Sequence, residues 1–504
     1  MHPRLVRVYP VRAASAAGVI LATAVALGAV APNPADGQVI TPKTVPVFQN
    51  QQFDILPSVT AGMAGVSIAV DDSLSDPFVN PAKTARVRGG SFFSSPFRHS
   101  ISGDRGGGRT MPFGGMGSIG DWAFAGAVAL QQIDRAGPMA FSSAISDHTA
   151  TNQYLWLSAA RTLGAGVSLG VSGSFATLDA VDGVDLLYPG SDRIRQSSGS
   201  SDLRIGLTKS FDGKKTLEAM LLHGQFDGTH DVHFGGQVWD QGIGSWVPIN
   251  RDEHNENRTR IWGAHAEYSQ PIGTEGWRIG WLATVNRLSH PKIPNYVLQS
   301  IPRDPGSTEA LNAGVGLSRE FGRSKFGLDF IVEPMRSSTW AEAARDTATV
   351  GGGTIKAGAK TVENSFNFAN TLMRVGFGHD IPMAKDSVSV FGFQLGVAVH
   401  SINYRLGQTN NVTQTFREQK ENWMEWTPTL GLSFRTGALQ LRYNYTASCA
   451  SSDCITIGRE VVAVATPNSG DVGSGGIIAA PGSALSFQGG SVTSHKLSVV
   501  IPIR

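Results

Sequence analysis

The strongest constraint on the fold is a strict alternation of apolar and polar residues near the end of the 504-residue chain. Apolar residues occupy every second position from 426 to 434, and after a turn at Thr436 and Gly437 they do so again from 439 to 445. Successive side chains of a strand point to opposite faces, so each segment has one apolar and one polar face. Aromatic residues near the ends of such segments, as at Trp426, are typical of transmembrane β-barrels, in which lipid-facing and lumen-facing side chains interleave.

The same alternation recurs along the chain as hairpins with short polar turns. One hairpin turns at 212–215 and another at 322–324. Further strands are expected to begin at Trp122, Tyr154, Val167, Arg260, Trp277, Asn370 and Val388, with two weaker strands at 86–97 and 110–119. The final strand carries apolar residues on one face and is expected to pair with the first strand, which would close the barrel.

The connections between these strands are of two kinds. One set is tight and lies near 162–165, 212–215, 270–276, 321–324 and 436–437. The other set is long and covers 179–200, 229–256, 290–307, 338–362, 404–422 and 447–490. Short turns on one rim and long loops on the other are typical of barrels in the outer membrane of a Gram-negative-type bacterium. The predicted fold class is therefore all-β, a transmembrane antiparallel β-barrel of fourteen to sixteen strands, the lower number holding if the two weak strands belong to a plug.

The N-terminus predicts export. Arg4, Arg7 and Arg12 precede an apolar stretch at 13–31, and small residues follow, which is the layout of a secretory signal peptide. Cleavage after Gly37 is the favoured site. An uncleaved anchor helix is the alternative, since the apolar stretch nearly reaches spanning length.

Residues 38–83 lack the alternation of the wall and come before the first strand. A small segment folded inside the lumen explains both properties. The predicted domains are therefore a signal peptide at 1–37, an N-terminal plug, or hatch, at 38–83 and the outer-membrane β-barrel at 84–504.

Charge and cysteine content argue against several classes of function. Beyond the N-terminus no apolar run could span a bilayer as a helix, and a formal net charge of +2 without a basic block gives no footprint for nucleic acid. Cys449 and Cys454 are predicted to form a loop disulfide, because no further soft ligand lies nearby to complete a metal site. The chain is predicted to be no enzyme and to use no cofactor or metal.

One N-terminal segment resembles a known family. The stretch at 61–72, Ala-Gly-Met-Ala-Gly-Val-Ser-Ile-Ala-Val-Asp-Asp, followed by Asn80, Pro81 and Ala82 before the first strand, resembles the hatch of the FadL-like outer-membrane transport family. That resemblance implies a plugged barrel through which long-chain fatty acids or other hydrophobic compounds cross, usually leaving sideways through the wall. It assigns Asn80, Pro81 and Ala82 to the hatch, with a role in gating. A related group with the same tripeptide resembles barrels of secretion systems that hold cargo at the cell surface.

Two glycine-rich motifs match enzyme fingerprints without the structural context that those fingerprints need. Residues 115–120, Gly-Met-Gly-Ser-Ile-Gly, match a dinucleotide-binding motif, but a strand follows instead of a helix. We expect these glycines to face the lumen and to leave room for the plug. Residues 166–170, Gly-Val-Ser-Leu-Gly, match a nucleophile elbow around Ser168, but the segment continues as a strand and offers no matching Asp and His pair.

Two groups of histidines and charged residues have ordinary interpretations. His230 and His233, with His254 further along, could bind a metal only if a turn brought them together, so a solvated loop is favoured. A lumen-facing set is expected to form pairs in a wet interior, or to orient a carboxylate headgroup. That set consists of His265, Glu267, Arg435 and Arg442.

Trp262 and Tyr268 are expected on one strand in the two interfacial girdles, since six residues span roughly 20 Å in a strand.

The predicted function is passive uptake of hydrophobic small molecules, with membrane lipids and the substrate as partners. Capture by apolar outer loops would be followed by transfer into an apolar pocket and by release when the plug backbone shifts near Asn80 and Pro81. Two alternatives remain open. One is a non-transporting barrel that serves as a scaffold for a surface or secretion-system protein through the loops at 229–256 and 447–490, and the other is a general porin.

Overall fold

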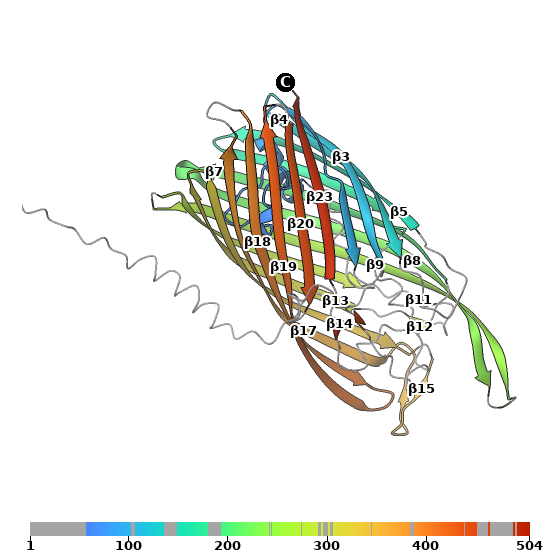
Figure 1. The fold of residues 1–504 in the computed structure, drawn as a ribbon. Coiled ribbons are helices and arrows are strands. Elements are labelled where there is room, and N and C mark those ends of the chain that lie inside the picture. Colours follow the sequence, from blue (N-terminus) through green and yellow to red (C-terminus); the bar gives the residue numbers. More distant parts are fainter. Residues whose placement is uncertain are drawn as a thin grey trace, which may run out of the picture.

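The main element of the structure, a computed structural model, is one antiparallel sheet that closes into a barrel (Figure 1). The structure describes residues 57–101, 106–135, 149–179, 193–240, 242, 244–273, 275–290, 294–295, 301–302, 306–343, 345–383, 388–437, 439–450, 462–463, 487–488 and 491–503. The signal-peptide prediction at 1–37 lies outside these residues, as does Cys454 of the predicted disulfide. Within them, none of the helices combines the length and the apolar character needed to cross a membrane.

The sheet contains seventeen strands in the described residues, and two of these share one position in the wall. The wall strands are β1 (Gly90–Ser94), β2 (Phe97–Ile101), β3 (Gly106–Ile119), β4 (Trp122–Arg135), β5 (Thr149–Gly164), β6 (Val167–Thr177), β7 (Arg193–Phe211), β8 (Lys215–Asp240), β9 (Ser245–Ile272), β10 (Trp277–His290), β13 (Gly306–Phe321), β14 (Ser324–Glu342), β17 (Lys360–Pro382), β18 (Val390–Asn410), β19 (Thr415–Thr436), β20 (Leu439–Ala450) and β23 (Ser491–Ile503). The last strand, β23, pairs with both β1 and β2, so the predicted closure of the barrel is confirmed.

The first position of the wall is one strand interrupted at Ser95 and Pro96. Both β1 and β2 pair with β3 on one side and β23 on the other, and the register runs on unchanged across the interruption. Proline has no N–H to donate to the ladder, but the Pro96 carbonyl accepts a hydrogen bond from the Leu497 N–H at 2.9 Å. The wall therefore has sixteen strand positions, the upper end of the predicted range. The first strand begins at Gly90 instead of residue 86, because residue 86 is still part of a 3₁₀ helix that spans Pro81–Arg86.

The wall has an apolar outer face and a more polar inner face. On β19, Leu430 and Leu432 point outward and are exposed, whereas Thr429 and Gly431, which alternate with them, point inward and are buried. The same alternation on β20 places Arg442 and Asn444 on the inner face. A closed wall with an apolar outer surface is the arrangement that hydrocarbon requires, since it leaves neither unpaired edges nor exposed polar groups facing lipid.

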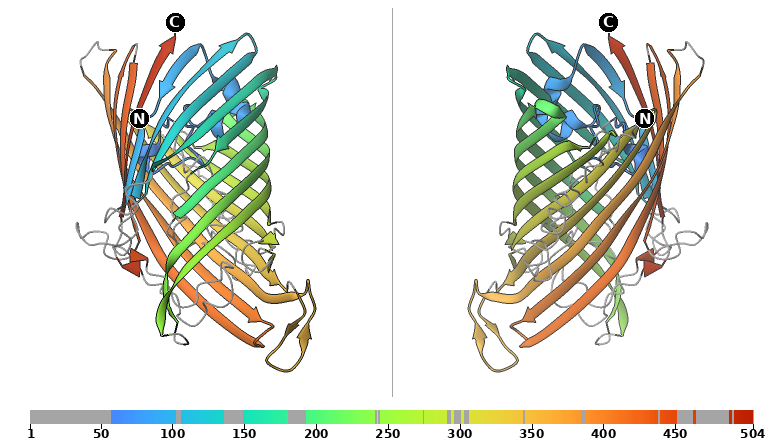
Figure 2. Two further views of the ribbon diagram at one scale, coloured as in Figure 1. Left: turned by 90° about the vertical axis from the view of Figure 1, so that its right-hand side faces the viewer. Right: turned by 90° about the vertical axis from the view of Figure 1, so that its left-hand side faces the viewer.

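The two rims differ as the sequence predicts. At one rim the strands are joined by tight turns, for example at 120–121, 212–214 and 322–323, and the chain also ends there. We call this the short-turn rim. At the opposite rim, the long-loop rim, the hairpin of β8 and β9 extends past the barrel, as does a small hairpin of β15 (Thr347–Ala348) and β16 (Thr354–Ile355) (Figure 2).

Two segments predicted as long loops are strands. The prediction at 229–256 was wrong, because β8 continues to Asp240 and β9 begins at Ser245. The prediction at 404–422 was also wrong, because β18 runs to Asn410 and β19 begins at Thr415. The outer faces of both extensions carry charged residues, such as His254 on the first and Arg405 on the second, so the apolar outer face that marks a membrane-embedded strand is absent while the backbone ladder continues.

The N-terminal part of the described chain lies inside the barrel, where Figures 1 and 2 show it as short blue helices enclosed by the wall. It contains the 3₁₀ helix η1 (Ala61–Met63), the short helix α3 (Asp76–Val79) and the 3₁₀ helix η2 (Pro81–Arg86). We call residues 57–88 the plug. Its contacts with strands on opposite sides of the lumen define the candidate functional site.

Candidate functional site

The extended part of the plug is bound to the wall by hydrogen bonds from its main chain. The Asp329 carboxylate on β14 accepts the N–H groups of Ser67 and Ile68, at 2.8 and 3.3 Å. The Arg374 guanidinium on β17 donates to the Gly65 carbonyl at 3.1 Å. Irregular backbone inside a barrel must find partners for its polar groups, and here wall side chains supply them.

Wall residues farther around the barrel hold the start of the plug in the same way. The Thr429 hydroxyl on β19 accepts the Ala64 N–H at 3.0 Å and donates to the Gly62 carbonyl at 2.9 Å. The Gln394 amide on β18 donates to the Val59 carbonyl at 2.8 Å. The first turn of the plug is therefore fixed to β18 and β19, which follow β14 and β17 in the wall.

Glycines on the inner face let the plug backbone approach the wall backbone. A Cβ atom added at Gly170 on β6 would overlap the Pro81 main chain, and one added at Gly376 or Gly396 would overlap the Met63 main chain. These glycines make room for the plug, a role that the sequence did not assign to them. The prediction that the glycines at 115–120 make this room was wrong, because Gly115 and Gly117 lie against residues 89–92 and Gly120 lies in a turn with a positive φ of 59°.

Asn80, Pro81 and Ala82 lie where α3 ends and η2 begins. Asn80 has extended backbone angles, and its side-chain oxygen accepts the Ala82 N–H at 3.1 Å, which caps η2. Pro81 occupies the first turn of η2, where its missing N–H leaves no unsatisfied donor. On the wall, Arg204 of β7 donates to the carbonyls of Phe78 and Val79 at 3.2 and 3.1 Å. The tripeptide thus forms the bend of the plug that rests against β6 and β7.

A buried cluster of charges joins the plug to β8. Lys83 Nζ lies 3.2 Å from Asp76 Oδ2 and 3.0 Å from Glu218 Oε2. Arg86 lies 3.5 Å from Glu218 and 3.1 Å from Asp71. Sequence reasoning missed this cluster, since Glu218 is simply one polar residue in an alternating strand.

Burial and the nearest opposite charges act in opposite directions on the pKa values of Asp76 and Lys83. Burial raises the pKa of Asp76 to about 7, because it disfavours the carboxylate more than the nearby Lys83 ammonium stabilises it, and Asp72 and Glu218 add to the rise. Burial alone would lower the pKa of Lys83, but the carboxylates of Asp76 and Glu218 outweigh it, so the pKa of Lys83 lies above its ordinary value. Lys83 therefore stays charged, while Asp76 can take up a proton near neutral pH.

An apolar contact packs the plug against β1 and β5 of the wall. The Phe78 ring stacks on Trp156 of β5, with ring centroids 4.0 Å apart, and meets Phe93 of β1 edge-on at 5.8 Å. All three rings are buried in a cluster that also contains the inward alanines of β4. Aromatic pairs of this geometry contribute about 0.5–1.5 kcal/mol each beyond area burial.

A second apolar cluster lies on the inner face nearer the long-loop rim. It consists of buried Phe366 and Phe368 of β17 and buried Tyr404 and Leu406 of β18, with half-buried Met335 and Trp423 at its edge. We call these six residues the inner aromatic patch. Sequence reasoning missed it because Tyr404, Leu406 and Trp423 fall in or beside a segment assigned to a loop. The alternation of Phe366 and Phe368 was the available signal.

Among the other lumen candidates, His265 and Arg435 have ordinary partners. His265 forms a hydrogen bond with Thr284 at 2.7 Å and lies 3.9 Å from Glu267. Arg435 lies 3.3 Å from Asp380. Arg442 lies on the same inner face of the neighbouring strand β20, opposite Ser433, and its Nε atom is buried without a hydrogen-bond partner among the described residues.

The histidines of the β8–β9 hairpin do not form a metal site. His233 pairs with Asp252 at 2.7 Å, and His254 pairs with Asp231 at 2.5 Å, each across the two strands. His230 lies on the opposite face of β8 and is in contact with Gln196 at 3.2 Å. Within the part of the chain that the structure describes, no three His, Cys, Asp or Glu residues are placed to hold a metal.

Three further candidates lie in regular wall strands. Ser168 sits in β6 between Thr162 and Thr208, in register with both, so it lacks the strand-to-helix turn of a nucleophile elbow. Trp262 and Tyr268 both lie on the outer face of β9, where Trp262 contacts His223 with ring centroids 4.2 Å apart.

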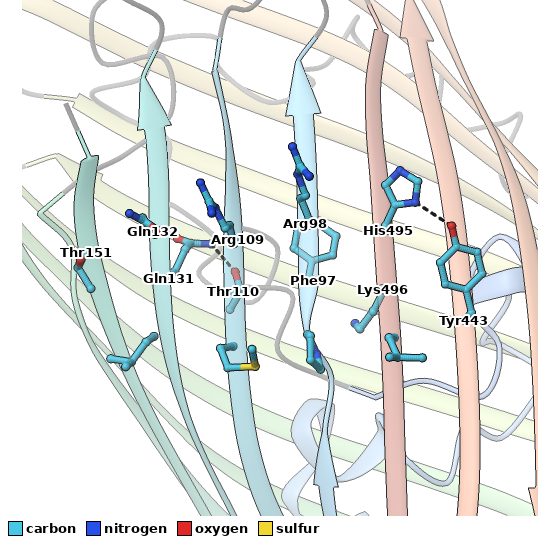
Figure 3. Close-up of a pocket in the computed structure, with 14 residues that line it drawn as sticks. Phe97, Arg98, Arg109, Thr110, Gln131, Gln132, Thr151, Tyr443, His495 and Lys496 are labelled. Atoms are coloured by element: carbon cyan, nitrogen blue, oxygen red, sulfur yellow. Dashed lines mark hydrogen bonds between the residues drawn. The ribbon is translucent and has the colours of Figure 1, made fainter. Parts of the chain in front are cut away.

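A groove on the outer face crosses the interrupted first strand. Its volume is about 600 Å³, and Figure 3 shows its lining residues on β2, β3, β4, β5, β20 and β23. Pro96 and Leu497 lie in it together with Arg98 and Arg109. It is separate from the plug, which occupies the inner side of the wall.

These features define a plugged, closed barrel of sixteen strand positions with an apolar outer surface. A scan against protein-family models finds no matching family, and a search of curated proteins finds no matching sequence. In fold the chain resembles solved outer-membrane transporters at low sequence identity. One is a FadL homologue of Pseudomonas aeruginosa, with 12% identity, a TM-score of 0.43, and coverage of 89% of this chain and 99% of that one.

Two further similar structures are toluene transporters. The P. putida transporter TodX has 10% identity and a TM-score of 0.41, with coverage of 88% of this chain and 98% of that one. The Ralstonia pickettii transporter TbuX has 10% identity and a TM-score of 0.39, with the same coverage of 88% and 98%.

Proposed function

We propose that this chain is an outer-membrane barrel that admits hydrophobic small molecules, such as long-chain fatty acids, by passive uptake past its plug. The observation that carries the proposal is the inner aromatic patch. In a barrel whose inner face is otherwise rich in polar residues, this patch presents apolar surface to the lumen at the half-buried edge formed by Met335 and Trp423. Ligand sites for apolar molecules are lined by aromatic and aliphatic side chains of this kind.

The proposed route has three steps. A hydrophobic compound is captured at the long-loop rim, moves to the inner aromatic patch and passes when the plug shifts at its bend near Asn80 and Pro81. The interruption of the first strand at Ser95 and Pro96 supports a sideways exit through the wall, since the ladder is weakest where a proline replaces a hydrogen-bonding residue.

Uptake of a labelled fatty acid into proteoliposomes tests the proposal. Trp423→Ala on the inner face is expected to reduce uptake several-fold at low substrate concentration, because it removes apolar contact area from the patch. Trp426→Ala on the same strand is the matched control, because Trp426 faces outward. Equal uptake by wild type and Trp423→Ala would contradict the assignment of the patch.

The gating role of the bend has its own test. Asn80→Ala with Pro81→Ala removes the cap of η2 and the fixed φ angle that follows it, and loss of such a cap costs about 1 kcal/mol. We expect uptake by this variant to change relative to wild type, in the same assay. Unchanged uptake would argue against gating at this position without bearing on the patch.

The extension of β8 and β9 beyond the wall favours the alternative of a surface or secretion-partner scaffold. Co-purification of a protein partner by the intact chain, lost when residues 229–256 are shortened, would support that alternative if fatty-acid uptake were also absent. Single-channel conductance separates a general porin from a plugged barrel, since an open aqueous pore would give a steady large conductance.

A further inference from the structure

The apolar outer face of the wall ends at charged residues on four neighbouring strands. The strands β9, β10, β13 and β14 follow one another in the sheet. Toward the long-loop rim, their last outward apolar residues are Trp262, Val285, Leu311 and Pro334. The next outward residues, two positions farther along each strand, are Arg260, Arg287, Glu309 and Arg336. We call the three arginines the arginine edge.

Four other neighbouring strands end their apolar outer face at uncharged residues. On β4, β5, β6 and β7, the exposed outward apolar residues are Leu130, Leu155, Phe175 and Leu203. The next outward residues toward the long-loop rim are Gln132, Gln153, Thr177 and Ser201. The arginine edge is therefore a feature of one side of the barrel and not of its whole outer boundary.

The side chains of the arginine edge are exposed and have no partners in the part of the chain that the structure describes. None of the three guanidinium groups forms an ion pair or a hydrogen bond with a described residue. Arg258, the next outward residue of β9, differs, because it pairs with Asp227 at 3.5 Å. Glu309 lies directly opposite both Arg287 and Arg336 in register. One carboxylate among three guanidinium groups leaves the edge positively charged.

The arginine edge lies at the level of lipid headgroups. Trp262 is 65% exposed and lies directly opposite Arg287. Tryptophan side chains on a barrel surface gather at the boundary between hydrocarbon and headgroups. The long-loop rim of an outer-membrane barrel faces the cell exterior, so this boundary belongs to the outer leaflet.

The three arginines form two basic points. Arg260 lies opposite Ser289, so Arg260 and Arg287 are diagonal neighbours on adjacent strands, and such neighbours are roughly 7–8 Å apart. Arg336 lies two strands beyond Arg287, which corresponds to about 10 Å at roughly 4.8 Å per strand. Guanidinium groups bind phosphate oxygens in a bidentate geometry. This spacing fits a headgroup that carries two phosphates.

We propose that the arginine edge binds a glycolipid of the outer leaflet whose sugar headgroup carries two phosphates. One phosphate lies between Arg260 and Arg287, the other lies against Arg336, and the acyl chains cover the apolar surface below them. The inference rests on the outer-membrane location proposed above and goes beyond the uptake function.

Lipid binding by the detergent-solubilised full-length protein tests the proposal. Diphosphorylated lipid A, its dephosphorylated counterpart and phosphatidylglycerol are titrated in mixed micelles against wild type and against the triple variant Arg260→Gln, Arg287→Gln, Arg336→Gln. The triple variant is expected to bind the diphosphorylated lipid about tenfold more weakly, because charge-assisted hydrogen bonds are lost. Its affinity for the dephosphorylated lipid is expected to equal that of wild type.

Glu309→Gln changes the charge of the same edge in the opposite direction. This variant is expected to bind the diphosphorylated lipid several-fold more tightly than wild type, because it removes the carboxylate that lies opposite Arg287 and Arg336. A lipid held only by apolar contact would bind the two proteins alike. Binding that is equal to or weaker than that of wild type would therefore contradict the placement of the phosphates.

The matched control removes three positive charges at the opposite rim, by Arg161→Gln, Lys209→Gln and Lys214→Gln together. Arg161 and Lys209 lie on the outer face beside the rings of Trp122 and Phe211. Lys214 lies in the turn between β7 and β8. The affinity of this control for the diphosphorylated lipid is expected to equal that of wild type. A loss as large as that of the triple variant would show that net charge alone controls binding, and would overturn the proposal.

Three other results would also overturn it. The first is equal affinity of the triple variant and wild type for the diphosphorylated lipid. The second is that wild type binds either of the other two lipids as tightly as the diphosphorylated lipid. The third is full competition by inorganic phosphate, which would assign the edge to a free anion.

Heat-modifiability in gel electrophoresis verifies that each variant is folded. Fatty-acid uptake by the triple variant is expected to equal that of wild type, because all three arginines lie outside the lumen. Failure of the uptake proposal with intact lipid binding would leave this inference standing, so the two failures are distinguishable.

Discussion

Lys83 Nζ on the plug lies 3.0 Å from Glu218 Oε2 on β8, and both side chains are buried. The same ammonium lies 3.2 Å from Asp76 within the plug. One lysine therefore joins the fold of the plug to its position on the wall. Removing one partner of a buried ion pair leaves an uncompensated charge, which is more costly than losing the pair as a whole.

Lys83→Met is expected to weaken docking of the plug by about 3–5 kcal/mol, since Glu218 and Asp76 would remain buried without their cation. The measurement is the frequency of channel openings in planar bilayers, which should rise. Lys325→Met provides the control, because Lys325 pairs with Glu320 at 2.7 Å in a more exposed position at the short-turn rim. Opening frequencies that match between Lys83→Met and wild type would show that the pair does not hold the plug.

Docking of the plug is expected to weaken as pH rises toward neutrality. Burial raises the pKa of Asp76 from 3.8 to about 7 in the docked plug. Below pH 3.8 the carboxyl is protonated whether the plug is docked or released, so the contribution of this group to docking is fully present. Between pH 3.8 and about 7 the carboxyl of the released plug is ionised while that of the docked plug still holds its proton. The contribution to docking therefore falls over this range and is fully lost above the docked pKa.

Asp76→Asn should remove this dependence. Conductance recorded from pH 5 to pH 8 is expected to show more openings of wild type at the upper end, and a flatter profile for the variant. Parallel profiles for the two proteins would mean that a different group controls docking.

Gly170→Ala is expected to destabilise the docked plug by about 1–3 kcal/mol, because the added methyl group would overlap the Pro81 main chain. Gly199→Ala on β7 is the control, since no atom lies within 4 Å of the position of its Cβ atom. Limited proteolysis of the plug compares the two variants. Faster cleavage in Gly199→Ala than in Gly170→Ala would contradict the predicted contact.

The β8–β9 hairpin is expected to lose stability at high pH. The hydrogen bond that His254 donates to the Asp231 carboxylate raises the pKa of His254 above its ordinary value of 6.5, and Glu256 adds to the rise. A raised histidine pKa stabilises the fold fully below pH 6.5, and this contribution is lost as pH rises through the raised value. Hydrogen exchange of the hairpin in wild type and His254→Gln should differ at pH 5.5 and converge at high pH. A constant difference would exclude titration of His254 as the cause.

The alternation of residues was sufficient to predict the wall but not its extensions. The hairpin around 212–215 appears as β7 and β8, joined at Asp212–Lys214, because its apolar residues face lipid and its polar residues face the lumen. In contrast, Arg405 and Glu418 lie in strands that the sequence assigned to a loop. Such strands beyond the apolar band carry polar residues on their outer face, so hydrogen bonding maintains them without the apolar alternation of a lipid-facing strand.

The sequence alone could not predict which plug residues contact which wall residues. Alternation shows that Glu218 and Gly170 face inward but carries no information about which plug residue each one meets. Lys83 and Pro81 are their partners only because the plug crosses the lumen at a particular height and angle. The tripeptide Asn80, Pro81 and Ala82 could be located in advance as the end of the plug, whereas its supports on β6 and β7 could not.

At Gly170, Gly376 and Gly396 the main chain of the plug lies directly against the main chain of the wall. Any side chain added at these three strand positions would have to displace the plug backbone itself. The Met63 side chain is also buried, beside Val66 and Val70, whereas the side chain of Ser67 is exposed. A library that randomises Ser67 should therefore keep more folded members than one that randomises these three glycines.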